Sequence, residues 1–273
     1  CIRDRWSATY YYKDKKLTSG GWRSTGVIFE SAYKQQARLQ TQIDDTFWSY
    51  PADPRRTYIR EQFDTSVGEY FYGFGEKFTT FTKNGSNVEI WNADGGTCSD
   101  QSYKSIPFYV SSRGYGVFVN SSDKVSYEVC SDTVSKVSMT LPGENMEYFV
   151  FGGANLTDVL KGYTDLTGKP ALPPAFTFGL WLTSSFTTSY DEETTNSFID
   201  GMAERDIPLQ VFHYDCFWMK GFEWCNFEWD KEQFPEPEAM LERLHKDKGL
   251  HSCVWINPYV CLLYTSPSPR DIS

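Results

Sequence analysis

The chain has 273 residues, a formal net charge of −10 and an aromatic fraction of 17%. The acidic charge excludes a general electrostatic affinity for nucleic acid or anionic membranes, and no run of about 18 apolar residues is present to cross a bilayer. The aromatic content suits either a large aromatic core or a surface that binds sugars through ring stacking.

The first part of the chain reads as short strands punctuated by Gly, Asn and Ser. Closely spaced strands without long helices indicate an antiparallel β-sandwich, which we assign to residues 1–166. A short helix is expected at 156–164, with Asn155 as its cap. The expected strands are 88–91, 107–110, 116–120, 125–129, 136–141 and 147–151.

A Pro- and Gly-rich linker follows at 167–175, and then the hydrophobic period changes. An apolar run at 176–182 is typical of a buried parallel strand. Helices are expected at 189–205 and 235–248, and further strands at 209–213 and 252–256. This β-α-β-α-β order predicts a parallel sheet with helical crossovers.

A closed (β/α)8 TIM barrel needs about 250 residues, whereas only 176–260 carry the pattern. The segment is either a small open α/β domain or a truncated barrel. Active-site residues of barrels lie just past the C-terminal strand ends, and polar and aromatic residues follow all three expected strands. We therefore favour the first three βα units of a truncated barrel.

The loop at 213–230 holds three Trp and three Phe beside four carboxylates. Carboxylates accept hydrogen bonds from sugar hydroxyls, and rings stack on sugar C–H faces. Asp215 is the best-placed acid, because it lies at a strand end. Glu223 and Glu228 lie in the loop and are not assigned a catalytic role, and Trp229 suits a packing role equally well.

Cysteine and histidine usage argues against a structural metal site or a disulfide framework. The seven Cys are scattered without a CxxC pair, and the chain has three His, so no metal or cofactor is expected. Residues 1–5 lack a signal-peptide pattern, so we expect a cytoplasmic protein. Because an initiator Met is missing, we expect the chain to begin inside a longer protein.

Several motifs resemble glycoside hydrolase family 31, specifically its α-xylosidase branch. The resembling segments are 72–78, 91–109, 167–181, 181–193, 197–209, 212–230 and 254–259. The resemblance implies an N-terminal β-sandwich followed by a (β/α)8 barrel. It also implies retaining hydrolysis of α-glycosidic bonds through a covalent intermediate and two Asp residues, without a cofactor or metal.

The resemblance also implies a set of substrate-binding residues. Asp94 matches a residue of the N-terminal loop that helps to close the sugar pocket, and Asp215 matches the acid that binds sugar hydroxyls. Aromatic and neighbouring residues complete the expected site: Phe186, Cys216, Phe217, Trp224 and Trp255. Family α-glucosidases have an Ile-Asp type pair where this chain has Cys216-Phe217. Apolar side chains there would fill the space of the glucose hydroxymethyl group, so xylose is the expected sugar.

The family's nucleophile lies in a later Lys-x-Asp strand, and its acid/base lies further on. Neither is present, so no residue of this chain is assigned as catalytic, and we expect the chain to be inactive alone. Residues 261–273 match no family pattern, and we expect a non-native tail, in which Asp271 is not the nucleophile.

Two alternatives stay open. The same fold would serve an α-glucosidase or a transglycosylase, and a non-catalytic sugar-binding β-sandwich would retain only binding. In each case the expected partner is an oligosaccharide, with no nucleic acid or membrane, and homo-oligomer formation of an intact enzyme is left open.

Overall fold

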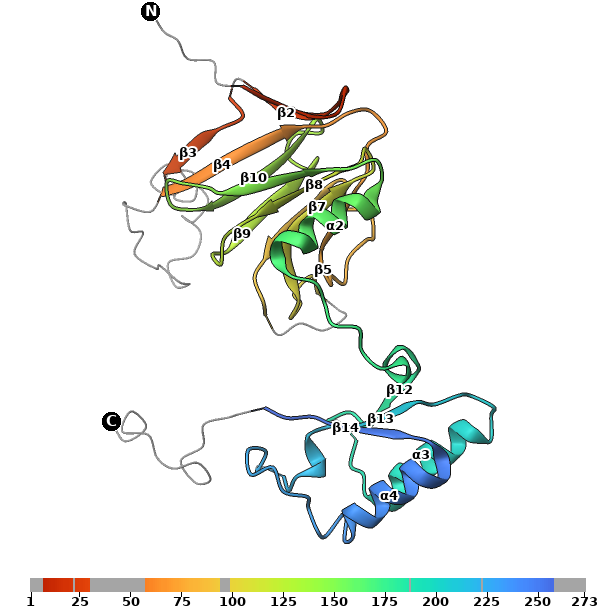
Figure 1. Cartoon of the computed structure of the whole chain (residues 1–273). Helices are drawn as coiled ribbons and strands as arrows, with labels where there is room; N and C mark the ends of the chain where they lie inside the picture. The colour runs from red at the N-terminus through yellow and green to blue at the C-terminus, as the bar shows by residue number, and fades with distance from the viewer. Residues whose placement is uncertain are drawn as a thin grey trace, which may run out of the picture. The chain divides into compact units, whose positions relative to one another are not determined.

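The computed structural model describes residues 7–21, 23–29, 57–93, 99–186, 188–221 and 223–257. The chain divides into two compact units, residues 1–170 and 171–273, which Figure 1 shows as a β-rich part and a smaller α/β part. Asp94 and the segment 261–273 lie outside the described residues, so the expectations placed on them stay predictions.

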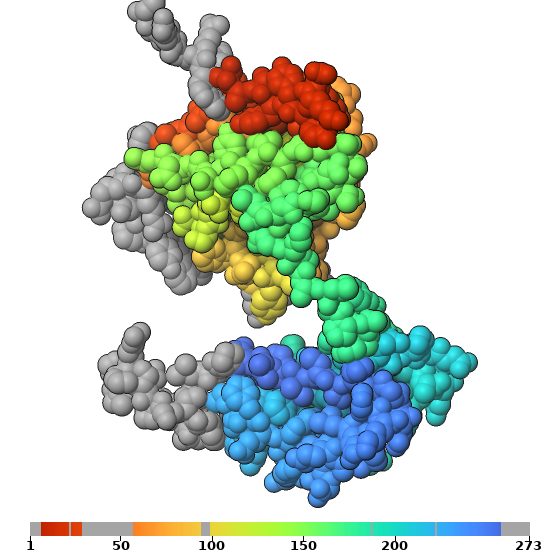
Figure 2. Space-filling view, in the orientation of Figure 1, coloured from red at the N-terminus to blue at the C-terminus, as the bar shows by residue number. Residues whose placement is uncertain are grey.

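The first unit contains two antiparallel sheets and a two-stranded pair, β1 (Ala8–Tyr12) with β2 (Lys15–Gly20). Figure 2 shows this pair, in red, gathered at one edge of the unit. The five-stranded sheet has the order β3 (Gly26–Phe29), β4 (Thr57–Asp64), β10 (Lys136–Pro142), β9 (Val125–Val129), β6 (Ser86–Ile90). The four-stranded sheet has the order β11 (Tyr148–Gly152), β8 (Tyr115–Val119), β7 (Ser105–Ser111), β5 (Phe71–Gly75).

A single aromatic-rich core joins the two sheets. Strand β9 shows the underlying period of two, with Val125, Tyr127 and Val129 buried and the residues between them partly exposed. The core's largest fully buried side chains are Tyr109, Tyr115, Tyr127, Phe63, Phe71 and Phe74. Much of the aromatic content of the chain therefore serves packing in this unit.

Strand β5 carries a bulge that its glycines make possible. Its pairing with β7 shifts register between Gly73 and Gly75, and Phe74 between them adopts a left-handed φ of 70°. A Cβ on Gly75 would lie 2.0 Å from the carbonyl oxygen of Lys104. Only glycine fits this close backbone approach.

Helix α2 (Leu156–Thr167) closes the first unit and packs against β8 and β11. The side chain of Asn155 accepts a hydrogen bond of 3.0 Å from Asp158 N, as the sequence predicts for a cap. The helix ends three residues later than expected and reaches into the predicted linker. It stops at Gly168, whose φ of 102° ends the helical backbone.

The second unit is built on a three-stranded parallel sheet of order β12 (Trp181–Thr183), β13 (Val211–Tyr214), β14 (His251–Val254). Helices α3 (Glu192–Ala203) and α4 (Pro237–Lys248) connect the strands and lie on the same side of the sheet in Figure 1. The predicted β-α-β-α-β order is observed. Helix α4 begins with Pro237 and is followed by the left-handed Gly249, the usual start and stop residues of a helix.

The apolar run at 176–182 differs from the expected strand. Its first part forms a 3-10 turn, η1 (Ala175–Phe178), and only Trp181–Thr183 pair as a strand. The turn is held by Thr177, whose amide and hydroxyl both donate to the carbonyl of Pro174 at 3.0 and 2.7 Å. The ring of Phe176 stacks on His251 at 3.6 Å instead of entering the sheet.

The helix-facing side of this sheet carries the core of the second unit. Phe212 and Tyr214 of the central strand are fully buried there, with Met219, Phe234 and Met240. The alternate residues Thr183, His213 and Cys253 lie side by side in the register of the sheet. Among the described residues, no helix is long and apolar enough to span a membrane.

Candidate functional site

The three strand ends of the second unit lie next to one another. Because the strands are parallel and in sequence order, Ser184, Asp215 and Trp255 follow them at the same edge of the sheet. The pairing extends past the strands, since Ser184 N donates to His213 O at 3.1 Å and Trp255 N donates to Tyr214 O at 2.8 Å. The parallel sheet thus brings the predicted rim residues together.

Asp215 follows the central strand and starts the 3-10 turn η2 (Cys216–Trp218). Its carboxylate oxygen Oδ1 accepts a hydrogen bond of 2.7 Å from Cys216 N. Its own amide donates to Ser184 Oγ at 3.0 Å, and its carbonyl accepts from the hydroxyl of Tyr190. The side chain is partly exposed, so the backbone is fixed while the carboxylate stays within reach of a ligand.

Cys216 is a neutral thiol in this setting. Its side chain is 5% exposed, and burial, followed by the charge of Asp215 and a hydrogen bond to it, raises the pKa of Cys216 to about 11. A thiol with this pKa is protonated at neutral pH, so it presents a small apolar surface and not a nucleophile.

Phe217 lies between two other rings. It meets Trp224 edge to face at a centroid distance of 5.8 Å and Tyr190 at 6.4 Å. Phe217 and Trp224 are partly buried against the core of the unit. The sequence placed Phe217 and Trp224 in one site, and the structure brings them into contact.

A pocket of about 200 Å³ opens beside Phe217. This volume is below the roughly 300–1,000 Å³ of complete small-molecule sites, and Phe217 is the only described candidate residue that lines it. The lining residues are Ser189, Tyr190, Phe217, Met219, Gly221, Asp230 and Gln233.

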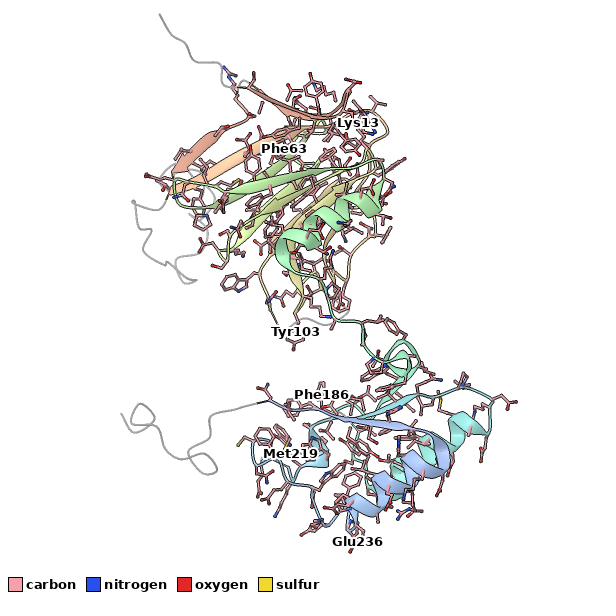
Figure 3. All side chains as sticks on the ribbon, viewed as in Figure 1. Lys13, Phe63, Tyr103, Phe186, Met219 and Glu236 are labelled. Atoms are coloured by element: carbon pink, nitrogen blue, oxygen red, sulfur yellow. The ribbon has the colours of Figure 1, made fainter. Side chains whose placement is uncertain are left out.

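Trp255 is partly buried at the end of β14, and its main-chain carbonyl accepts a hydrogen bond of 2.7 Å from Trp218 Nε1. Phe186 differs from the other candidates, because its side chain is 68% exposed at the surface of the unit, whereas Met219 is fully buried. Figure 3 labels both residues. Ser185, beside Phe186, has a φ of 65°, which is a strained value for a non-glycine residue.

The loop acids that the sequence left unassigned make local contacts. Glu223 Oε2 accepts from Asn226 Nδ2 at 3.3 Å, and Asp230 Oδ1 accepts from Glu232 N at 3.0 Å. These bonds shape the loop. Within the described ranges, no group of three or more His, Cys, Asp and Glu side chains is placed to hold a metal ion.

Sequence reasoning did not assign Ser184, Tyr190 and Trp218, whose side chains contact the backbone of the candidate residues. Ser184 and Trp218 lie in the segments that follow the strands, and this position was the one sequence signal that could have marked them as site residues. Tyr190 fell inside the expected helix 189–205, where a single aromatic residue is interpreted as a residue that packs in the hydrophobic core. The hydrogen bond from the Tyr190 hydroxyl to the Asp215 carbonyl has no signature in the sequence.

Comparisons with known proteins agree with the order of the two units. Residues 3–128 match the family described as "Glycosyl hydrolase 31 N-terminal galactose mutarotase-like domain". Residues 170–267 match "Glycosyl hydrolases family 31 TIM-barrel domain", a match that runs into the segment where the sequence led us to expect a non-native tail.

Among curated relatives, the α-xylosidase XylQ of Lactiplantibacillus pentosus is 52% identical over 236 residues, which are 85% of this chain and 31% of XylQ. The α-xylosidase of Emericella nidulans is 50% identical over 248 residues, which are 91% of this chain and 30% of that enzyme. The chain therefore spans about a third of the length of these relatives.

A solved structure of a Flavobacterium johnsoniae family 31 dextranase with isomaltotriose superposes with a TM-score of 0.67 and 25% identity, covering 91% of this chain and 27% of the dextranase. The dextranase complexed with glucose gives a TM-score of 0.70. Two domain matches in the order of the two units, with relatives at 50% identity or more, show that this chain belongs to glycoside hydrolase family 31.

Proposed function

We propose that the chain forms the N-terminal part of a retaining α-glycosidase that releases α-linked xylose from the non-reducing ends of oligosaccharides. The observation that carries this proposal is the Asp215-Cys216-Phe217 segment, which follows the central strand with a buried neutral thiol and a partly buried ring. The similarity to two α-xylosidases supports the same sugar.

The choice of sugar follows from the chemistry of this segment. Xylose lacks the hydroxymethyl group that glucose carries on C5. In this proposal, a wall formed by the Cys216 thiol and the Phe217 ring offers that group only the weak hydrogen bonding of a thiol and occupies its space. Apolar discrimination of one small group is worth about 1–3 kcal/mol, so a strong preference for xylose is expected, but not an absolute one.

The remaining candidate residues have binding roles in this proposal. Asp215 accepts hydrogen bonds from sugar hydroxyls, and the rings of Phe186, Trp224 and Trp255 line the sugar site. Asp94 is included as a substrate-binding residue because of the family resemblance of its segment.

In our proposal, the strands β12, β13 and β14 with the helices α3 and α4 belong to the first three βα units of an eightfold barrel. A retaining glycosidase needs two carboxyl groups about 5–5.5 Å apart, and we place both on later barrel strands. The chain alone is therefore inactive, and its contribution to the reaction is to bind and select the sugar.

The direct test joins residues 1–257 to the C-terminal part of XylQ that follows the matched region. We expect this fusion protein to hydrolyse p-nitrophenyl α-D-xyloside with a kcat/KM well above that for the α-D-glucoside. The 273-residue chain alone should show no turnover of either substrate. Equal kcat/KM values for the two substrates would contradict the sugar assignment, and turnover by the chain alone would contradict the placement of the carboxylates.

A second candidate function is an α-glucosidase or a transglycosylase of the same family. It is supported by an α-glucosidase of Saccharolobus solfataricus, which is 32% identical over 184 residues, 65% of this chain. The same kinetic comparison separates the candidates, because an α-glucosidase would favour the glucoside and a transglycosylase would form longer oligosaccharides from it.

A further inference from the structure

Both polar groups of the Asp215 backbone are held by side chains from the loop between β12 and α3. The amide of Asp215 donates to Ser184 Oγ at 3.0 Å, and its carbonyl accepts from the Tyr190 hydroxyl. Ser184 and Tyr190 are each only 4% exposed. Water therefore cannot easily replace either bond, and the peptide planes on both sides of Asp215 are fixed.

The two residues are themselves well anchored. Ser184 continues the pairing of β12 with β13, because its backbone N–H donates a hydrogen bond of 3.1 Å to His213 O. Tyr190 precedes Asp191, whose Oδ1 caps α3 by accepting from Thr194 N at 2.8 Å. The Tyr190 ring also packs against Phe217 and, at 6.2 Å, Phe234. Burial raises the pKa of Tyr190, so its hydroxyl stays protonated and can donate.

The segment that these bonds hold has only short-range bonds of its own, chiefly Trp218 N to Asp215 O at 3.1 Å and Met219 N to Cys216 O at 3.2 Å. The turn η2 has three residues, Cys216–Trp218, and short 3-10 turns have poor hydrogen-bond geometry. A rotation of the peptide at Asp215 would move its carboxylate and the Phe217 ring together. We propose that Ser184 and Tyr190 are positioning residues for sugar recognition, which hold Asp215 and Phe217 in their binding geometry before a sugar arrives. This proposal rests on the proposed function for the identity of the ligand.

The competing explanation is that both bonds only satisfy buried backbone groups, as in any core. Under that explanation, removal of the Tyr190 hydroxyl lowers the stability of the whole unit and has no special effect at Asp215. The thiol of Cys216 distinguishes the two explanations, because it follows Asp215 directly and is buried in the folded chain.

The first experiment measures the iodoacetamide alkylation rate of Cys216 by peptide mass spectrometry in the 273-residue chain. Urea unfolding of each variant gives the reference for opening of the whole unit, because Cys253 is partly exposed and can react in the folded chain. We expect Tyr190→Phe and Ser184→Ala each to raise the Cys216 rate about tenfold, as the loss of one buried hydrogen bond allows, and by more than the change in the free energy of unfolding accounts for. Ser184→Thr keeps the hydroxyl and should react like the wild type.

Tyr214→Phe is the matched control. Tyr214 is fully buried in the same unit, and its hydroxyl lies 4.0 Å from Met240 Sδ and away from Asp215. We expect no change at Cys216 in this variant. A Cys216 rate that is unchanged in Tyr190→Phe, or that rises only as much as the lost free energy of unfolding accounts for, would overturn the proposal.

The second experiment places the same substitutions in the XylQ fusion protein. Tyr190→Phe should lower kcat/KM for the α-xyloside about 10- to 100-fold, because a small displacement of a binding group costs that much. If Cys216 becomes more reactive while kcat/KM stays unchanged, the bonds are structural and the proposal fails. If the wild-type fusion protein folds but does not turn over, the proposed function fails, and the alkylation result still decides whether Ser184 and Tyr190 position Asp215.

Discussion

Trp218 Nε1 donates a hydrogen bond of 2.7 Å to the main-chain carbonyl of Trp255. Trp218 lies in the turn after β13, and Trp255 directly follows β14, so this bond joins the second strand end to the third. Ser184 and Tyr190 join the first strand end to the second through Asp215. Side-chain bonds to the backbone thus link all three strand ends of the candidate site.

Trp218→Phe should destabilise the second unit by about 1–3 kcal/mol, because it leaves the Trp255 carbonyl without its donor while keeping a ring in the core. Urea unfolding followed by circular dichroism measures the change. Trp181→Phe is the matched control, because Trp181 Nε1 also donates to a carbonyl, that of Thr177 at 3.1 Å, but the residue is 44% exposed. Equal losses in the two variants would contradict a specific role for the Trp218 bond.

Gly75→Ala should destabilise the β-sandwich more than Gly85→Ala. Both glycines have a φ near 80°, and a left-handed non-glycine residue costs about 1–2 kcal/mol at either position. Only at Gly75 would the new Cβ collide with a backbone atom, the Lys104 carbonyl oxygen at 2.0 Å. Thermal unfolding of the two variants checks this order. The explanation of the β5 bulge is wrong if Gly85→Ala is the less stable protein.

His213 should make the second unit less stable in mild acid. Burial lowers the pKa of His213, although the charge of Asp215 opposes the shift, and the ring pairs through Nδ1 with Thr183 Oγ1 at 2.8 Å. The unfolded chain keeps the usual histidine pKa of about 6.5. Below that pH the unfolded state binds more protons than the folded state, so stability falls as the pH drops through this value.

The pH effect of His213 can be isolated with His213→Asn, which keeps a polar group near the Nδ1 position. We expect the free energy of unfolding to drop less between pH 7.5 and pH 5.5 in this variant than in the wild type. Urea unfolding at both pH values gives the comparison. An equal drop in the two proteins would show that His213 does not titrate as described.

The later strands of the sandwich could be predicted because alternation is clear in them, as in β9. The early strand β4 was missed for a physical reason. Its buried face includes Glu61, which is 4% exposed and accepts a hydrogen bond of 2.5 Å from Thr25 Oγ1, so an acid stands where the pattern requires an apolar residue. In β5 the bulge at Phe74 breaks the period of two.

The candidate site was predictable only in part. The position of Asp215 at a strand end follows from the β-α-β order, because parallel strands place their C-terminal ends together. The hydrogen bond from Tyr190 to Asp215 joins residues that are 25 positions apart, so it depends on the tertiary fold of the loop that carries Tyr190. The 3-10 turn at Ala175–Phe178 likewise depends on the hydrogen bonds of Thr177 and not on hydrophobicity.

We propose that Cys216 and Phe217 of this chain select xylose. The most direct measurement is the ratio of kcat/KM for p-nitrophenyl α-D-xyloside to that for the α-D-glucoside. It is compared between the XylQ fusion protein and its Cys216→Ile, Phe217→Asp double variant. The new carboxylate can accept a hydrogen bond from the glucose hydroxymethyl group, and the lost ring vacates the space for it. We expect the ratio to fall about 10- to 200-fold toward glucose.

Phe227→Asp is the control for adding a carboxylate to the same loop, because Phe227 is 50% exposed, and this variant should keep the ratio of the parent. A double variant that keeps the parent's preference for the xyloside, while still folded and active, would contradict the claim that Cys216 and Phe217 choose the sugar.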